Sequence, residues 1–304
     1  MDLGKLAVWA HIDGPISYFE NETSAQLGPA SADRLARFAR RVEELGYDAI
    51  WMPGGFGRDP LIVSSWLLAN TSRLRVATGI VSIYTRDAIA MRGAADALNE
   101  QSGGRFILGL GVSHRETVED RRGHEYGKPI PTMRAYLDAI EQAPYMAAAP
   151  AEPTPIVLAG LREKMIGLSG TRAQGTHSYL VTTEHTAEAR AILGPDKLLC
   201  VEQPMVLESD PVKARAVARG EVEFYLSKPN YQNSWKALGF SDEDLANGGS
   251  DHFIDSIFGW GDEAALRKRI DEHLHAGATQ VCIKAVAPDG GTDMRLLERL
   301  APGG

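Results

Sequence analysis

Eight short apolar runs, separated by stretches with helical periodicity, constrain the fold of this chain more than any other feature. Short apolar runs bounded by glycine, proline or polar residues are typical of buried strands. The eight runs are Leu6–Ala10, Asp48–Met52, Arg75–Ser82, Arg105–Leu110, Pro155–Ala159, Thr176–Val181, Leu198–Leu207 and Gln280–Lys284. Repeated strand–helix units favour a parallel sheet, and eight of them favour a closed TIM-type (β/α)8 barrel with insertions over an open doubly wound sheet. Because such barrels reach about 250 residues as one domain, we predict a single domain over residues 1–304.

Three segments interrupt this alternation. The polar segment 21–31 is long enough to overhang the barrel mouth as a lid, whereas the Ala/Pro-rich segment 144–155 has no core periodicity and is typical of a spacer. The segment 227–261 is an aromatic-rich insertion that carries Tyr231, Trp235, Phe240, Phe253, Phe258 and Trp260. Such an insertion closes a pocket, enters a subunit interface or forms a core of its own, and the sequence leaves these three possibilities open.

Composition and charge exclude several classes of function. The formal net charge is −8 with acidic and basic residues interspersed, which gives no basic face for nucleic acid. Cys200 and Cys282 lie in apolar runs and are expected to act as small hydrophobes, without a disulfide framework or zinc spacing. The chain shows neither a signal-peptide pattern nor a membrane-spanning apolar run. We therefore expect a soluble cytoplasmic protein that acts on a small molecule, with no metal and no membrane partner.

A glycine-rich motif spans residues 104–114, where the run Phe106–Leu110 stops at Gly111, Val112, Ser113 and His114. A helical pattern begins near Arg115, so backbone N–H groups and a hydroxyl gather at a helix start, an arrangement suited to an anion. The alternative is a strand-to-helix turn in which glycine serves backbone geometry alone. The local sequence does not decide between the two.

A barrel places its active site at the carboxyl ends of its strands, and the residues expected there are aromatic rings, glycines and histidines. His11, His114 and His177 are the candidate acid/base groups, because imidazole exchanges protons near neutral pH. This set suits a large flat ligand with a phosphate tail, and it contains no carboxylate pair with glycosidase spacing. His273 and His275 lie on an amphipathic helical stretch and are expected to be solvated.

Four parts of the sequence carry a family resemblance: Gly103 to His114, Val76 to Val81, the stretch Ala32 to Trp51, and Trp260 to Asp262. Together they resemble the bacterial luciferase-like superfamily, and more closely its branch of deazaflavin-dependent oxidoreductases. The resemblance covers almost the whole chain. It implies a TIM-type barrel that binds coenzyme F420 or, alternatively, FMN.

The resemblance also implies positions for cofactor contacts. The family often has a non-prolyl cis peptide behind the flavin ring, and the matching pair here is Gly79 and Ile80. The phosphate is then expected at the backbone of two turns, one formed by Gly111, Val112 and Ser113 and the other by Gly160 and Leu161. These contacts are expectations from the family.

One departure from the family pattern concerns the acid/base group. Relatives often have an Asp-His pair after the second strand, whereas Gly54 and Gly55 occupy the matching positions here. His114 is the leading replacement, with His11 and His177 next. Three functions stay open: an F420-dependent oxidoreductase, an FMN-dependent monooxygenase and a non-catalytic flavin-binding relative. The family resemblance also implies a homodimer that acts on a small organic substrate.

Overall fold

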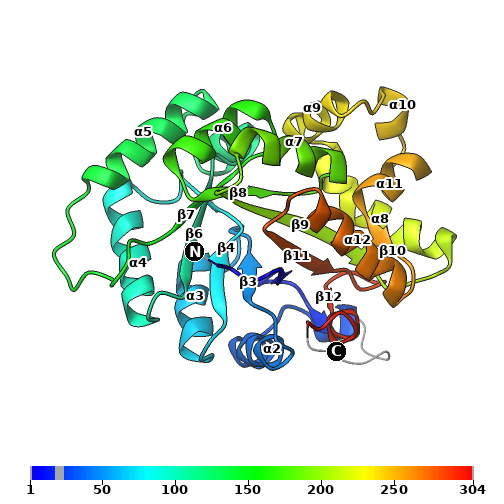
Figure 1. The fold of residues 1–304 in the computed structure, drawn as a ribbon, viewed down its shortest axis with the longest axis horizontal. Coiled ribbons are helices and arrows are strands. Elements are labelled where there is room, and N and C mark those ends of the chain that lie inside the picture. The colour runs from blue at the N-terminus through cyan, green and yellow to red at the C-terminus, as the bar shows by residue number, and fades with distance from the viewer. Residues whose placement is uncertain (1, 18–23, 303–304) are drawn as a thin grey trace.

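Eight parallel strands close into a barrel in the computed structural model, which describes residues 2–17 and 24–302 (Figure 1). In order around the barrel the strands are β1 (Leu6–Trp9), β3 (Ala49–Met52), β4 (Arg75–Thr78), β6 (Phe106–Gly111), β7 (Ile156–Ala159), β8 (Gly175–Ser178), β9 (Leu198–Val206) and β11 (Gln280–Ala285). The ring closes because β1 pairs with both β3 and β11. The predicted (β/α)8 barrel is confirmed, and its strands coincide with the eight predicted runs to within a few residues.

The helices of the repeating units lie outside the strands and surround them, as Figure 1 shows. They are α2 (Ala32–Glu44), α3 (Pro60–Ala69), α4 (Ala88–Gln101), α5 (Pro129–Gln142), α6 (Glu163–Arg172), α7 (Thr183–Leu193), α8 (Pro211–Leu226), α12 (Glu263–His275) and α13 (Met294–Arg299). Local sequence fixes where several of them begin, since Ser31, Asp59 and Asp87 each accept hydrogen bonds from backbone N–H groups of the first turn.

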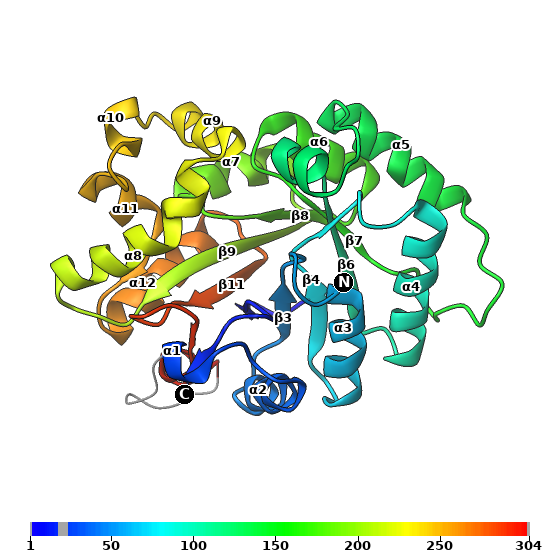
Figure 2. The ribbon, with the colours of Figure 1, turned by 180° about the vertical axis from the view of Figure 1, so that it is seen from behind.

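Short elements decorate the barrel. They are the strands β2 (Ile16–Ser17), β5 (Val81–Ser82), β10 (Gly259–Trp260) and β12 (Thr292–Asp293), the helices α1 (Ser24–Leu27), α9 (Pro229–Ala237), α10 (Asp242–Leu245) and α11 (Asp251–Ile257), and a π-helix, η1 (Thr117–Arg121). The predicted lid 21–31 begins at residues outside those described. The predicted spacer 144–155 is a loop without helix or strand that extends from one edge of the molecule (Figure 2).

Two apolar layers stabilise the barrel. Most of the core lies between the strands and the surrounding helices, with Val8, Ile50 and Phe38 among its members. A second cluster fills the lumen and includes Trp51 and Ile107, since every other residue of a strand points inward. Both cysteines are free and buried in this lumen cluster, as expected for small hydrophobes.

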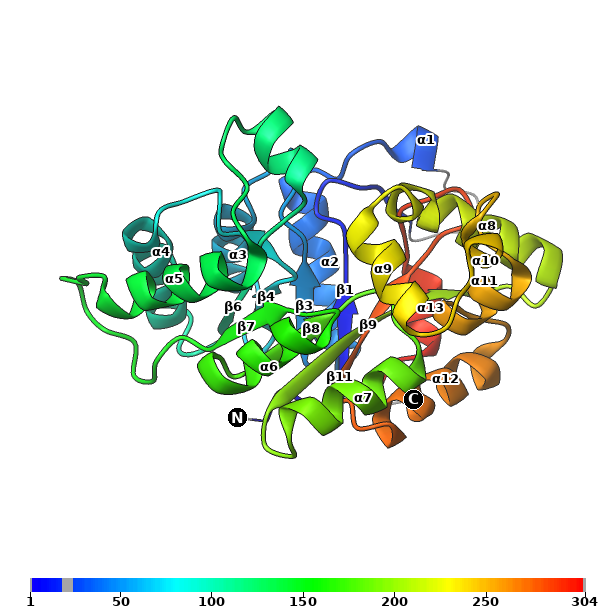
Figure 3. The same ribbon diagram turned by 90° about the horizontal axis from the view of Figure 1, so that it is seen from above.

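The aromatic-rich insertion forms α9, α10 and α11 beside α8, over the ends of β8 and β9 (Figures 1 and 3). Its own core includes Trp235, whose ring lies 4.9 Å from that of Phe253 and whose Nε1–H donates to the Leu180 carbonyl at 2.9 Å. Tyr231 of the insertion faces the cavities described below. The insertion therefore both packs as a core and closes a pocket.

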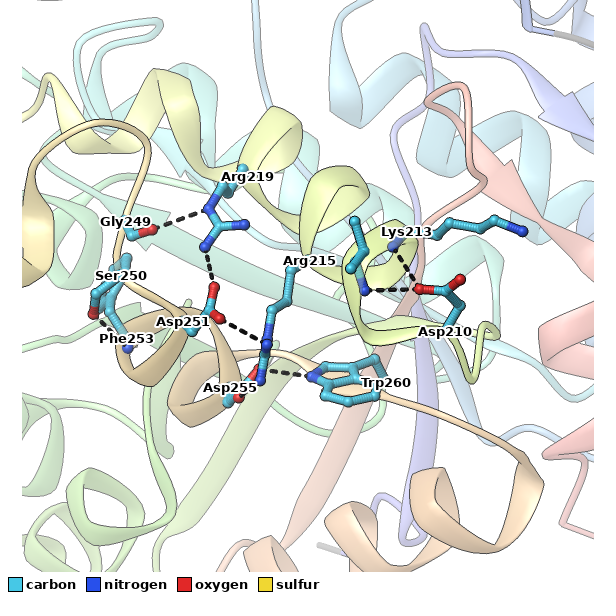
Figure 4. Close-up of polar contacts among 11 residues, drawn as sticks. Asp210, Lys213, Arg215, Arg219, Gly249, Ser250, Asp251, Phe253, Asp255 and Trp260 are labelled. Carbon is cyan, nitrogen blue, oxygen red and sulfur yellow. Dashed lines mark hydrogen bonds and ion pairs between the residues drawn. The ribbon is translucent and has the colours of Figure 1, made fainter.

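Ion pairs hold this insertion to α8 (Figure 4). The Arg215 guanidinium donates to both carboxylate oxygens of Asp255 at 2.9 and 2.5 Å, and Trp260 donates to the same carboxylate at 2.8 Å. Arg219 pairs with Asp251 and also donates to the carbonyl of Gly249 at 3.0 Å. A bidentate arginine pair orients its two helices as well as attracting them. These contacts attach the insertion to α8 through α11.

Candidate active site

Two adjoining cavities open at the carboxyl ends of the barrel strands. The first cavity has a volume of about 680 Å³ and lies against the β3–α3 loop, and the second has about 550 Å³ and lies against the start of α6. Their common lining is Ile80, Ser113, His114, Ala159, His177, Tyr179 and Tyr231. One ligand with two chemically different ends can therefore occupy both.

All ten predicted site residues lie on these cavities. His11 and Gly79 line the first cavity, Gly111, Val112, Gly160 and Leu161 line the second, and Ile80, Ser113, His114 and His177 line both. The strand ends meet at one mouth because the sheet is parallel throughout the barrel. The structure thus brings the predicted residues together, and their individual roles stay predictions.

Ile80, which lines both cavities, belongs to a bulge where the third predicted run breaks into β4 and β5. The peptide bond between Gly79 and Ile80 is cis, as the family resemblance implied. The Gly79 N–H donates to the Met52 carbonyl at 2.7 Å, and the Gly54 N–H donates to the Ile80 carbonyl at 2.8 Å. Backbone hydrogen bonds from the second strand region therefore hold both sides of the bulge.

The glycines of the 104–114 motif make room for this bulge. A Cβ at Gly109 would lie 1.8 Å from the Thr78 carbonyl oxygen, and one at Gly111 would lie 2.6 Å from Cδ1 of Ile80. The Thr78 hydroxyl also bridges the N–H and C=O of Gly109, at 2.8 Å each. Close packing of β6 against the bulge thus requires both glycines. At these two positions, this supports the interpretation that glycine is needed for backbone geometry.

His177 lies at the floor of both cavities. Its ring stacks on Trp51 at 4.7 Å, and its Nδ1–H donates to the Cys200 carbonyl at 3.1 Å. Nε2 is buried and has no hydrogen-bond partner among the described residues. Burial lowers the pKa of His177 to about 4, so the imidazole is neutral at pH 7 and Nε2 keeps an unpartnered lone pair.

His114 and His11 lie higher in the mouth. His114 is half-buried beside the ring of Tyr231 at 5.9 Å, and burial together with the Lys228 ammonium lowers its pKa. His11 packs edge-on against Trp9, and desolvation together with Lys284 lowers its pKa as well. Both imidazoles are therefore mainly neutral at pH 7 and can accept a proton.

A buried polar network beneath the first cavity was not predicted as a unit from the sequence. The Lys284 ammonium donates to the Tyr179 hydroxyl at 2.8 Å and pairs with Glu221, and the Tyr179 hydroxyl lies 2.9 Å from that of Tyr225. Burial lowers the pKa of Lys284, but Tyr225, Glu221 and Glu202 outweigh this effect and raise it. Lys284 ends the eighth predicted run, which is the signal that could have found the network.

Glu202 is the most unusual member of this region. Its side chain is fully buried, with Oε2 accepting the Leu180 N–H at 3.1 Å and Oε1 lacking a partner among the described residues. Burial raises the pKa of Glu202 to about 8 despite the opposing effect of Lys284. The barrel therefore holds a neutral carboxylic acid at pH 7.

One sequence prediction is wrong. His273, expected to be solvated, is fully buried, with Nε2–H donating to Gln203 Oε1 at 2.6 Å and Nδ1 lying 2.9 Å from the Thr186 hydroxyl. It shares the inner face of α12 with Leu266 and Ile270, at helical spacing. Polar partners on neighbouring elements satisfy both nitrogens, and an apolar pattern alone does not reveal such partners.

Among the described residues, no helix is long and apolar enough to cross a membrane, and no group of three or more His, Cys, Asp or Glu residues is placed to hold a metal ion.

A closed parallel barrel with paired cavities at its carboxyl ends defines the class of (β/α)8 enzymes. Within that class the chain belongs to the luciferase-like monooxygenase family, whose model matches residues 16–280. A 5,10-methylenetetrahydromethanopterin reductase from Methanolobus tindarius is 25% identical over 290 residues, covering 82% of this chain and 89% of that protein.

Two further proteins that are similar to this chain carry names that include coenzyme F420. A Mycobacterium tuberculosis protein, named provisionally as a coenzyme F420-dependent oxidoreductase, is 34% identical over 107 residues, which cover 35% of this chain and only 31% of that protein. The solved coenzyme F420-dependent tetrahydromethanopterin reductase from Methanopyrus kandleri superposes with a TM-score of 0.74 at 16% identity, covering 99% of this chain and 98% of that one. The fold is therefore that of the family over nearly the whole chain.

Proposed function

We propose that this protein is a coenzyme F420-dependent oxidoreductase that acts on a small organic substrate. The observation that carries the proposal is the pair of cavities joined across the Gly79-Ile80 bulge, since a flat ring with an anionic side chain needs two compartments of different chemistry. The names of the similar reductases and oxidoreductases support it. The bound deazaflavin would supply hydride transfer at its ring carbon.

The residues present fit such a coenzyme. His177 Nε2 is a buried acceptor without a partner, as expected where a ligand donates a hydrogen bond. The backbone of Gly111, Val112 and Ser113 and that of Gly160 and Leu161 would hold the phosphate, with α6 starting at Glu163 directly behind the second turn. The Gly79-Ile80 bulge would support the ring.

His114 would hold and move the substrate proton, with His11 as the second candidate. Both line the first cavity, where the substrate would lie, and both have lowered pKa values. Their basicity suits a group that takes a proton from an alcohol or returns it to a carbonyl. Tyr231 and the rest of the insertion would keep water out of the mouth.

Titration with the two cofactors tests the proposal. Purified protein is titrated separately with coenzyme F420 and FMN, and quenching of cofactor fluorescence is measured. The proposal expects tighter binding of F420, with His114→Ala retaining that affinity and Ser113→Asp, which places a carboxylate beside the expected phosphate, losing it. Tighter binding of FMN would favour the flavin monooxygenase that the family name suggests. Binding of neither by folded protein would favour a non-catalytic relative, for which Gly54 and Gly55 in place of an acid/base pair are the supporting observation.

We further propose that the protein acts in the cytoplasm as a homodimer. Large apolar side chains are exposed on α3 and at the start of α4: Ile62 is 71% exposed, Trp66 42% and Ile89 58%. Ile62 and Trp66 lie one turn apart on the same face of α3, and such patches mark association surfaces. Light scattering is expected to give twice the 33.0 kDa of the chain, and Ile62→Lys to give the monomer.

A further inference from the structure

Two tyrosine hydroxyls and a buried ammonium form a chain beside the first cavity, and the function proposed above gives them no role. The Lys284 ammonium donates to the Tyr179 hydroxyl at 2.8 Å, and that hydroxyl lies 2.9 Å from the Tyr225 hydroxyl. The three residues come from β11, from the segment after β8 and from α8. Tyr179 lines both cavities and Tyr225 lines the first. The chain therefore ends at the cavity where the substrate would lie.

The number of protons in this chain leaves one hydroxyl without an acceptor. An ammonium group only donates, so Lys284 accepts no hydroxyl proton. The hydrogen bond between the two tyrosines uses one of their two O–H groups. Neither hydroxyl makes any other hydrogen bond within residues 2–17 and 24–302, apart from the one accepted from Lys284. One O–H group is therefore left to donate to a ligand.

The position of the cation decides which hydroxyl this is. A hydroxyl beside an ammonium turns its oxygen toward the cation and its proton away, and accepting that bond strengthens it as a donor. Tyr179 therefore donates to Tyr225, and the remaining O–H group belongs to Tyr225. Burial raises the pKa of Tyr225, although Lys284 and the hydrogen bond with Tyr179 oppose this effect, so the phenol keeps its proton at pH 7.

The first cavity offers this donor no anionic partner from the protein. Asp59 is the carboxylate among the described residues that line this cavity, and it pairs with Arg86 at 2.6 Å. The Glu221 carboxylate pairs with Lys284 and is hydrogen-bonded to neither tyrosine in the part of the chain that the structure describes. A neutral donor held in a largely buried site is suited to an oxygen atom on which negative charge develops.

We propose that the Tyr225 hydroxyl donates a hydrogen bond to the oxygen on the reacting carbon of the substrate. The inference rests on the proposed function and deepens it, because it makes the substrate a carbonyl compound or the corresponding alcohol. When hydride adds to a carbonyl carbon, the π electron pair of the C=O bond moves to oxygen, and a donor at that oxygen stabilises the charge. His114 supplies the proton that completes the alcohol, so Tyr225 keeps its own. Tyr179 is a positioning residue that connects Tyr225 to the Lys284 ammonium.

An oxyanion probe tests this donor without turnover. Purified protein is titrated with para-nitrophenolate, whose absorption band moves to shorter wavelength when its phenolate oxygen accepts a hydrogen bond, and with nitrobenzene, which lacks that oxygen. Tyr225→Phe keeps the ring and removes the hydroxyl. It is expected to bind the phenolate about tenfold more weakly than the wild type, the factor that one hydrogen bond to a charged group supplies. It is also expected to lose the band shift and to bind nitrobenzene as the wild type does.

Tyr179→Phe interrupts the chain and leaves the donor in place. It is expected to weaken phenolate binding only about twofold, because it removes the polarisation of Tyr225 by its neighbour. Adding it to Tyr225→Phe should cause no further loss of affinity, since Tyr179 acts through Tyr225. The matched control is Tyr136→Phe, which removes a hydroxyl that donates to the Arg86 carbonyl at 2.8 Å and should change neither affinity.

Three results would overturn the inference and leave the proposed function standing. They are equal binding of the phenolate by Tyr225→Phe and the wild type, a larger loss in Tyr179→Phe than in Tyr225→Phe, and no preference of the wild type for the phenolate over nitrobenzene. The coenzyme titration is a separate measurement. If the probe behaves as expected and coenzyme F420 does not bind, the oxyanion donor stands and the proposed function falls.

Discussion

The buried acid at Glu202 makes the stability of this barrel depend on pH in a calculable way. Replacing it by glutamine keeps the shape of the side chain and removes its ionisation. In the folded protein the pKa of Glu202 is raised from 4.5 to about 8 by burial, so the folded state binds more protons than the unfolded state between these values. The contribution of Glu202 to the free energy of unfolding is therefore fully present below pH 4.5 and is lost as pH rises toward 8.

The size of the effect follows from the same shift. One pKa unit corresponds to about 1.36 kcal/mol, so the wild type is expected to lose on the order of 4 kcal/mol relative to Glu202→Gln between pH 5 and pH 9. Equilibrium urea unfolding measures this difference at each pH, with tryptophan fluorescence as the signal, because Trp51 is fully buried in the lumen. The glutamine variant should become the more stable protein at alkaline pH.

The control is Glu223→Gln, which removes an exposed carboxylate from α8. It is expected to follow the wild type at every pH. If the free energies of unfolding of the wild type and Glu202→Gln ran parallel from pH 5 to pH 9, Glu202 would have to be ionised in the fold, and the reasoning from burial would be wrong.

Three further substitutions test other parts of the structure. Gly109→Ala places a Cβ 1.8 Å from the Thr78 carbonyl oxygen and is expected to cost about 3 kcal/mol in thermal unfolding; an unchanged melting temperature would contradict this. Gly55→His meets no atom within 4 Å at its Cβ and is expected to change stability by less than about 0.5 kcal/mol, so a clear loss would show a hidden constraint. Burial lowers the pKa of His273 to about 3, so between about pH 6.5 and 3 only the unfolded state takes up this proton. At pH 5 the free energy of unfolding of the wild type is expected to fall by about 2 kcal/mol relative to His273→Gln, as measured by urea unfolding. Identical pH dependence of the two proteins would refute this prediction.

The fold was predictable because strand periodicity and helix ends are local properties. The eight runs were short and apolar, and each was followed by a glycine, a proline or a capping residue such as Asp59 or Asp87. Boundaries shifted where tertiary contacts decide them: the third run breaks at Gly79, where β4 gives way to the bulge. Nothing in the local pattern gives that break without the family resemblance.

The site was predictable only in outline. The barrel rule places strand ends at one mouth, which is why His11, His114 and His177 meet there. The network of Lys284 with Tyr179 and Glu221 was not predicted, because it joins residues from β11, the loop after β8, and α8, whose pairing depends on helix placement. His273 was misplaced for the same reason, since its partners come from other elements.

The packing of the glycine motif determines which substitutions within it can test ligand binding. Thr78 and Ile80 fill the space that a side chain at Gly109 or Gly111 would need. These two glycines are therefore required for packing against the bulge, and any ligand contact that they make is through the backbone. A bulky residue at Gly111 would move Ile80, which forms part of the wall of both cavities. Substitution there would therefore reshape both cavities together, whereas a change at Ser113 or Lys164 would alter the lining of the second cavity without disturbing the bulge. Variants at Ser113 and Lys164 can therefore test the proposed phosphate contact separately from formation of the site.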